Sequence, residues 1–272
     1  MRVERIARDG ISWELASRAP CAPLRRHLHS LVGFDERSQQ PCSRREFPEP
    51  WLVVIIEFGP PLRVTMGADA ARNPGGFAAG LGDRHAITQH EGHSCGVQVD
   101  LTPTGARRLF GIPMSELSGR IVGLRELFPL EYDVLIERLA ATSDWGVRLD
   151  LVEAFLLWRI ERARIDTARV DWAVAQIERA AGRLDVGWLA RELGYSHKHL
   201  IALFRDQVGI PPKLLARLVR FERMISAARA ARAPGWTELA LGHGYFDQAH
   251  LARDVKRFTG LTPTEVRALD PR

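Results

Sequence analysis

The chain has 272 residues, 46% of them hydrophobic, and carries 38 lysines and arginines against 33 aspartates and glutamates. This composition is typical of a folded globular protein, and the length leaves room for two domains, which excludes a largely disordered chain. Apolar runs stay far below the roughly 20 residues of a membrane-spanning helix, and acidic residues interrupt the N-terminus where a signal peptide would be apolar, so we predict a cytoplasmic protein.

The first 130 residues predict mostly short β-strands. Apolar runs over 51–58, 62–66 and 95–101 alternate with glycine and proline, the residues that mark turns. Strands at this spacing are typical of a barrel or a sandwich. A short helical piece is expected after the last of these runs, over 105–110.

Two helices are expected next, because residues 130–141 and 148–164 carry apolar side chains at helical spacing. The apolar stripe of the second helix is wide. The apolar residues beside the main stripe could pack within the domain or contact another subunit. The polar stretch 165–169 is predicted to be a linker. We therefore divide the chain into an N-terminal domain, 1–164, and a C-terminal domain, 165–272.

Net charge distinguishes the two domains. Residues 165–272 carry 17 basic and 12 acidic side chains, whereas the first 164 residues carry equal numbers of each. The whole positive excess of the chain therefore lies in the C-terminal domain, which favours a polyanionic partner for that domain alone.

The C-terminal domain is predicted to be all-helical and contains an internal repeat. Leu189-Ala190 and Gly194-Tyr195 recur fifty residues later as Leu239-Ala240 and Gly244-Tyr245. Each copy predicts a helix, a turn at the glycine and a second helix with a capping residue at its start. This is the helix-turn-helix arrangement, in which the second helix, the recognition helix, enters the major groove of DNA.

The two motifs extend over about 186–208 and 236–258. A helix of about 20 residues, starting at Pro212 and ending near residue 231, is expected to join them. Two copies on one chain, within a basic segment, distinguish this arrangement from a plain helical bundle.

This segment resembles the DNA-binding domain of the AraC/XylS family of transcription regulators over about residues 170–269. The resemblance rests on Leu189-Ala190, Gly194-Tyr195-Ser196, His199-Leu200, Leu203-Phe204, Gly209-Ile210, Pro212, Arg220-Phe221, Gly244-Tyr245, Asp247-Gln248, His250-Leu251, Arg253, Lys256, Gly260 and Pro263. Residues 96–103 and 109–113 resemble the effector domains of actinobacterial members. The resemblance implies an α+β protein with a mostly-β, cupin-like N-terminal barrel with trailing helices and an all-α C-terminal domain with tandem helix-turn-helix motifs.

The resemblance also implies a function. It predicts a one-component, sequence-specific transcription regulator, not an enzyme, that inserts two recognition helices into adjacent major-groove segments of double-stranded promoter DNA. It leaves open RNA polymerase, a small-molecule effector and a second copy of the chain as further partners, and no cofactor or membrane is expected. The sequence does not identify the effector, the promoter or the direction of regulation.

The candidate DNA contacts lie opposite the core anchors of each recognition helix. Arg253 has the fork that bridges O6 and N7 of guanine, and Gln248 can pair with adenine. Arg205, Lys256 and Arg257 suit phosphate contacts better. The resemblance implies base or backbone contacts for Lys198, Ile201, Ala202, Gln248, Ala249, His250, Ala252 and Arg253.

Three candidate positions have alternative interpretations. Family members often have polar residues where this chain has Ile201 and Ala202, which can contact only a thymine methyl group, so the first motif is expected to recognise fewer base pairs. Ile201 could also simply pack against the protein. Arg220, on the joining helix, shares a face with Arg217 and Arg223. It is a candidate DNA contact, and the alternatives are a solvated face or contacts between the motifs that fix their spacing.

The N-terminal domain contains one cluster of potential metal ligands. His85, His90, His93 and Cys95 lie within eleven residues, and His90 and His93 flank a predicted hairpin tip. We interpret them as loop histidines in solvent, without a metal. The alternative is a metal site, and with it a metal-dependent cupin-type enzyme fused to a DNA-binding tail. The three cysteines of the chain are too far apart for a disulfide framework and are expected to be reduced thiols.

Overall fold

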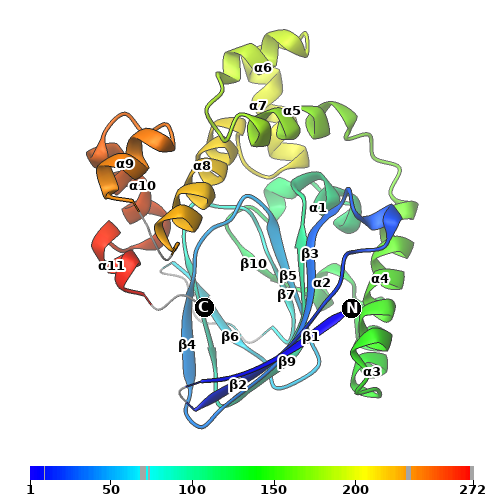
Figure 1. The fold of residues 1–272 in the computed structure, drawn as a ribbon. Coiled ribbons are helices and arrows are strands. Elements are labelled where there is room, and N and C mark those ends of the chain that lie inside the picture. Colours follow the sequence, from blue (N-terminus) through cyan, green and yellow to red (C-terminus); the bar gives the residue numbers. More distant parts are fainter. Residues whose placement is uncertain (9, 68–71, 73, 231–233, 270–272) are drawn as a thin grey trace.

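The computed structural model describes residues 1–8, 10–67, 72, 74–230 and 234–269. They form a β-rich N-terminal domain with helices after its strands, and an all-helical C-terminal domain (Figure 1). The predicted fold class is therefore confirmed. Among the helices in these ranges, none has the length and apolar character needed to cross a bilayer.

Seven strands form the larger sheet, in the order β1-β2-β3-β9-β5-β7-β10, and all neighbours are antiparallel. Their bounds are β1 Arg2–Arg8, β2 Ile11–Ser17, β3 Leu28–Ser38, β5 Leu52–Glu57, β7 Phe77–Ala79, β9 His93–Leu101 and β10 Ile121–Gly123. The apolar runs predicted over 51–58 and 95–101 become the neighbouring strands β5 and β9, where Val54 lies opposite Val99.

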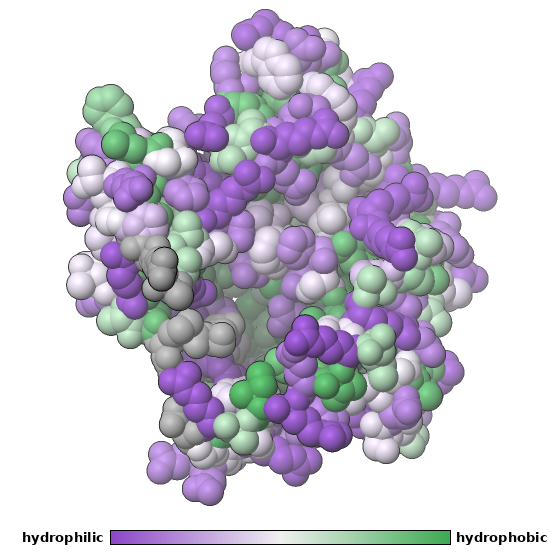
Figure 2. Space-filling view, in the orientation of Figure 1, coloured by the Kyte–Doolittle hydropathy of each residue, from purple (hydrophilic) through white to green (hydrophobic). Residues whose placement is uncertain are grey.

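Three strands form the smaller sheet, in the order β4-β8-β6: β4 Cys42–Glu46, β8 Ala86–His90 and β6 Arg63–Met66. Side chains on β5 alternate between two cores, as strand geometry requires. Leu52 and Val54 pack toward the helices, whereas Ile55 packs with Val64 and Met66 of the smaller sheet. The two sheets therefore enclose a barrel-like interior, and Figure 2 shows this face of the molecule hollowed, with apolar surface inside the hollow.

The trailing helices cover the outer face of the larger sheet. They are α1 Pro103–Phe110, α2 Leu124–Leu127, α3 Glu131–Ala140 and α4 Trp145–Arg162. Asp144 caps α4 by accepting a hydrogen bond from the backbone N–H of Val147. Of the extra apolar residues of α4, Leu151, Phe155 and Leu157 are partly buried against the same core, whereas Trp158 is 40% exposed. The wide stripe therefore packs largely within the domain.

The C-terminal domain contains seven described helices around a second core. They are α5 Ala168–Arg179, α6 Val186–Glu192, α7 His197–Gln207, α8 Pro212–Ala228, α9 Trp236–Gly242, α10 Gln248–Thr259 and α11 Pro263–Ala268. Asp185, Ser196, Asp247 and Thr262 accept hydrogen bonds from the first turns of α6, α7, α10 and α11, as capping residues do. The end predicted for the joining helix near residue 231 lies outside the described residues, and α8 ends at Ala228.

The two domains pack against each other. Leu81, from the N-terminal domain, is buried within the C-terminal core, and the ring of Phe47 lies edge-on to Phe221 with centroids 6.3 Å apart. The stretch predicted as a linker takes part in this contact, because Thr167 is buried and its hydroxyl accepts a hydrogen bond from Arg108 Nε at 3.2 Å. The C-terminal domain is therefore docked against the barrel by side chains from both domains.

Candidate nucleic-acid interface

The first motif consists of α6 and α7. Gly194 begins the turn between them with φ +67°, a left-handed conformation that favours glycine. Leu200 and Phe204 are fully buried and anchor α7 to the core, as predicted. The opposite face exposes Lys198, Ala202 and Arg205.

Ile201 is half-buried on α7. Its side chain therefore packs partly against the protein and keeps part of its apolar surface exposed. Together with the adjacent Ala202, it gives the outer face of α7 little hydrogen-bonding capacity. The charged groups of this face lie toward the two ends of the helix, at Lys198 and Arg205.

The second motif consists of α9 and α10 and repeats this geometry. Gly244 has φ +73°, and Leu251 and Val255 are fully buried. The opposite face of α10 is richer in polar groups than that of α7. Gln248, Ala249, Arg253, Lys256 and Arg257 are exposed, and His250 and Ala252 are half-buried.

Two of the α10 candidates are oriented by hydrogen bonds. The Thr237 hydroxyl on α9 donates to Oε1 of Gln248 at 3.4 Å. The imidazole Nδ1 of His250 accepts the backbone N–H of Phe246, also at 3.4 Å, which leaves Nε2 to carry the proton of the neutral ring. Gln248 and His250 therefore both present N–H donors beyond their internal bonds.

Arg220 does not lie on the outer surface of the joining helix. Its side chain is 14% exposed and lies between α8 and the second motif. The guanidinium donates to the carbonyl oxygen of Gly244 at 3.4 Å, lies 4.7 Å from the centroid of the Tyr245 ring, and is 3.7 Å from the buried carboxylate of Asp254. All three partners belong to the second motif, so this placement favours a role in holding that motif to the joining helix over a DNA contact or a solvated face.

Asp254 is a residue that the sequence analysis missed. Its carboxylate, 6% exposed, also accepts a hydrogen bond from Arg217 at 2.7 Å, so two arginines of α8 meet one acid of α10. The signal was available in the sequence. Asp254 lies three residues after the anchor Leu251, on the core face of α10, and a buried carboxylate needs a cationic partner nearby.

Arg257, a candidate phosphate contact, is already paired within the molecule. Both Nε and Nη2 lie near Oδ2 of Asp83, at 2.9 and 2.8 Å, and Asp83 belongs to the N-terminal domain. Arg45 of the same domain donates to the carbonyl oxygen of Thr259, at the end of α10, at 3.1 Å. The N-terminal domain thus holds the C-terminal end of the second recognition helix.

We predict that Asp83→Asn in the full chain tightens DNA binding by up to about fivefold. In the variant, Arg257 does not have to break its ion pair with Asp83 before it contacts a phosphate. The measurement is a gel-shift titration at low ionic strength. Asp133→Asn is the matched control, since Asp133 pairs with Arg125 at the same 2.8 Å but lies within the N-terminal domain. Equal affinities of the Asp83 variant and the unaltered chain would contradict the prediction.

The histidine cluster of the N-terminal domain is divided by the fold. His90, at the end of β8, is buried with Nε2 3.1 Å from Glu36, while His93, at the start of β9, is half-buried with Nε2 3.3 Å from Asp35. The expectation of loop histidines in solvent is therefore wrong for His90. His85 lies elsewhere, against Gly260.

The potential ligands form two separate groups, Asp35 with His93 and Cys95, and Glu36 with Cys42 and His90. Each group has a feature that does not favour a metal. Arg44 donates to both carboxylate oxygens of Glu36. Burial raises the pKa of the Cys95 thiol to about 12, which keeps it protonated at neutral pH, whereas metals bind the thiolate.

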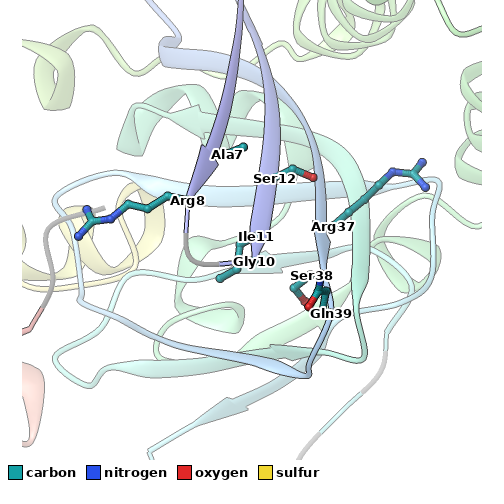
Figure 3. A pocket seen from close by; sticks show the side chains of 8 residues that line it. All are labelled: Ala7, Arg8, Gly10, Ile11, Ser12, Arg37, Ser38 and Gln39. Carbon is teal, nitrogen blue, oxygen red and sulfur yellow. The ribbon is translucent and has the colours of Figure 1, made fainter.

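A shallow pocket lies at the hairpin between β1 and β2 and the end of β3. Figure 3 shows its lining, which includes Ser12 and Ser38, with the side chains of Arg8 and Arg37 pointing away in opposite directions. The hairpin lies at the end of the barrel away from α7 (Figure 1). We assign no role in DNA binding to this pocket.

A family model matches the C-terminal part of the chain. Residues 189–268 match the model of a helix-turn-helix domain family. No curated protein matches the chain by sequence.

The solved structures similar to the chain include two bacterial proteins. A transcriptional regulator with an AraC-type DNA-binding domain from Chromobacterium violaceum is 20% identical, over 38% of this chain and 95% of that one, with a TM-score of 0.34. ToxT from Vibrio cholerae is 12% identical, over 84% of this chain and 96% of that one, with a TM-score of 0.48.

Both motifs and the helix that joins them therefore belong to one recognised kind of domain. Residues 189–268 match a helix-turn-helix domain, and this range contains the turns and recognition helices of both motifs. The C-terminal part of the chain therefore contains a helix-turn-helix domain, a kind of domain whose second helix enters the major groove of DNA.

Proposed function

We propose that this chain is a one-component regulator whose C-terminal domain, 165–272, places α7 and α10 in adjacent major-groove segments of promoter DNA. The observation that carries the proposal is that two capped recognition helices, each with an exposed face, share one core with the joining helix α8. Arg217 and Arg220 of α8 also pair with Asp254 of α10. The positive excess of the chain lies in the same domain, which suits a phosphate backbone.

The proposed contacts divide by chemistry. Arg253 and Gln248 contact base edges through their bidentate groups, with Ala249 and Ala252 beside them and His250 as an additional donor. Arg205, Lys256 and Arg257 bind phosphates. Lys198 serves the first motif as a base or backbone contact, and Ile201 and Ala202 offer only apolar contact. Arg220 is assigned to the scaffold that spaces the two motifs.

The N-terminal domain, 1–164, is proposed to sense a signal and to pass it through its contacts with α10. Its apolar interior suits a small-molecule effector, which stays a prediction, as do RNA polymerase and a second copy of the chain. Among the described residues, no specific observation favours the alternative of a metal-dependent enzyme.

The experiment that tests this function selects binding sites for the full chain from random duplex DNA and footprints the result. We expect enriched sites with two protected segments on one face of the duplex. We also expect affinity to fall with salt, with a log–log slope of about −0.9 per phosphate contacted. Binding without any sequence enrichment would overturn the proposal.

We also predict an asymmetric site. The half bound by the first motif should tolerate base changes better than the half bound by Gln248 and Arg253, because Ile201 and Ala202 cannot hydrogen-bond to a base edge. Affinity measurements on point-mutated sites check this prediction. A larger loss of affinity for base changes in the half bound by the first motif would contradict it.

A further inference from the structure

The turn of the second motif is one residue longer than that of the first. In the first motif the capping residue Ser196 follows Tyr195 directly, whereas in the second Phe246 stands between Tyr245 and the capping residue Asp247. Phe246 is 87% exposed, the most exposed large apolar side chain among the described residues. The additional residue therefore carries an aromatic ring that is exposed to solvent.

The backbone that carries this ring is held on both sides. Tyr245, immediately before it, is buried, and the guanidinium of Arg220 lies over its ring. Immediately after it, Asp247 accepts the backbone N–H of His250 at 2.6 Å, and Phe246 donates its own N–H to Nδ1 of the same histidine. The Phe246 ring is thus presented to solvent from a fixed turn at the N-terminal end of α10.

This position lies beside the proposed base contacts. Gln248 and Ala249, the first two residues of α10, are both exposed, and Phe246 precedes them by two and three residues. The phosphates and most base-edge atoms near such a helix end are polar. The apolar feature that the major groove offers is the 5-methyl group of thymine, which phenylalanine side chains contact in protein–DNA complexes.

We propose that Phe246 is a specificity-determining residue that selects a thymine through its 5-methyl group, in the half-site bound by the second motif. The inference rests on the function proposed above and goes beyond it by assigning a base preference to the additional residue of the turn. Contact with the methyl group removes apolar surface of both partners from water, and only thymine among the four bases offers that group.

The test uses the full chain and duplexes taken from the random-library selection. Each thymine of the second half-site is replaced in turn by deoxyuridine, which removes only the methyl group. We expect one replacement to weaken binding of the unaltered chain roughly three- to fourfold, the effect of one buried methyl group. Phe246→Ala should bind the thymine duplex more weakly and show no difference between thymine and uracil at that position.

Two further variants complete the experiment. Phe246→Leu keeps an apolar side chain and should retain part of the preference for thymine. Leu130→Ala is the matched control, because Leu130 is also highly exposed, at 82%, but lies in the N-terminal domain, and it should behave as the unaltered chain.

Three outcomes would overturn the inference while leaving the proposed function intact. In the first, the selected half-site contains no preferred thymine. In the second, every deoxyuridine replacement weakens binding of the unaltered chain no more than it weakens binding of Phe246→Ala. In the third, Phe246→Ala weakens binding equally to every duplex, which would indicate contact with the sugar–phosphate backbone. Failure of the selection to enrich any sequence would instead overturn the proposed function, and this inference with it.

Discussion

Replacing Arg253 with alanine is expected to weaken binding to the selected site by about 1–3 kcal/mol, or roughly 5- to 150-fold, the range for a bidentate contact to guanine. Arg253 is exposed on the outer face of α10, and within the described part of the chain no ion pair or hydrogen bond occupies its guanidinium. The loss of affinity should be confined to sites with the preferred base pair, because the variant no longer distinguishes the bases at that one position.

The measurement is a comparison of binding-site selections for the variant and the unaltered chain. Arg257→Ala provides the contrast, since loss of a phosphate contact weakens all sequences alike and lowers the salt slope by about one. Arg138→Ala, an exposed arginine of α3, controls for the loss of one positive charge. An unchanged preference at every position for Arg253→Ala would remove Arg253 from the residues that contact bases.

The second large effect is expected for Arg220→Ala, on stability. The variant leaves Asp254 with one cationic partner instead of two, and it loses the contact with the Tyr245 ring and the bond to the Gly244 carbonyl. We expect the free energy of unfolding to fall by roughly 2–3 kcal/mol. This is less than the 3–5 kcal/mol for leaving a buried charge wholly unpaired, because Arg217 remains.

Thermal or denaturant unfolding of the full chain checks this value. Arg223→Ala is the control on the same helix, because Arg223 is exposed and donates a hydrogen bond to the Glu178 carbonyl at the surface, so it should lose less than about 1 kcal/mol. In DNA binding, Arg220→Ala should tolerate altered spacing between the half-sites better than the unaltered chain. Unaltered stability together with a uniform loss of DNA affinity would return Arg220 to the candidate DNA contacts.

Elements whose signals lie within a few residues of one another could be predicted from the sequence alone. Gly194 and Gly244 adopt the left-handed conformation that their turns require, and Ser196 and Asp247 cap the recognition helices. These features involve residues a few positions apart, so the distances between them follow from the local backbone conformation. The same holds for the buried stripe of α4 and for the anchors of both recognition helices, which follow from helical periodicity.

Local spacing also explains where the sequence analysis failed. His90 and His93 are three residues apart, but the hairpin tip places them on different strands, and each belongs to a separate group of side chains. Periodicity places Arg220 on one face with Arg217 and Arg223, yet it does not say which neighbour that face meets. Packing of α10 against α8 decided that Arg220 is directed inward, because Asp254 is buried between the two helices.

The contact between the two domains could not be predicted from the sequence. Asp83 and Arg257 are 174 residues apart in the chain, and neither carries a local signal for the other. The order of the strands and the docking of the C-terminal domain bring them to within 2.8 Å. The reason is physical: short-range backbone preferences fix helices, turns and caps, whereas contacts between distant segments depend on how all the apolar faces are buried together.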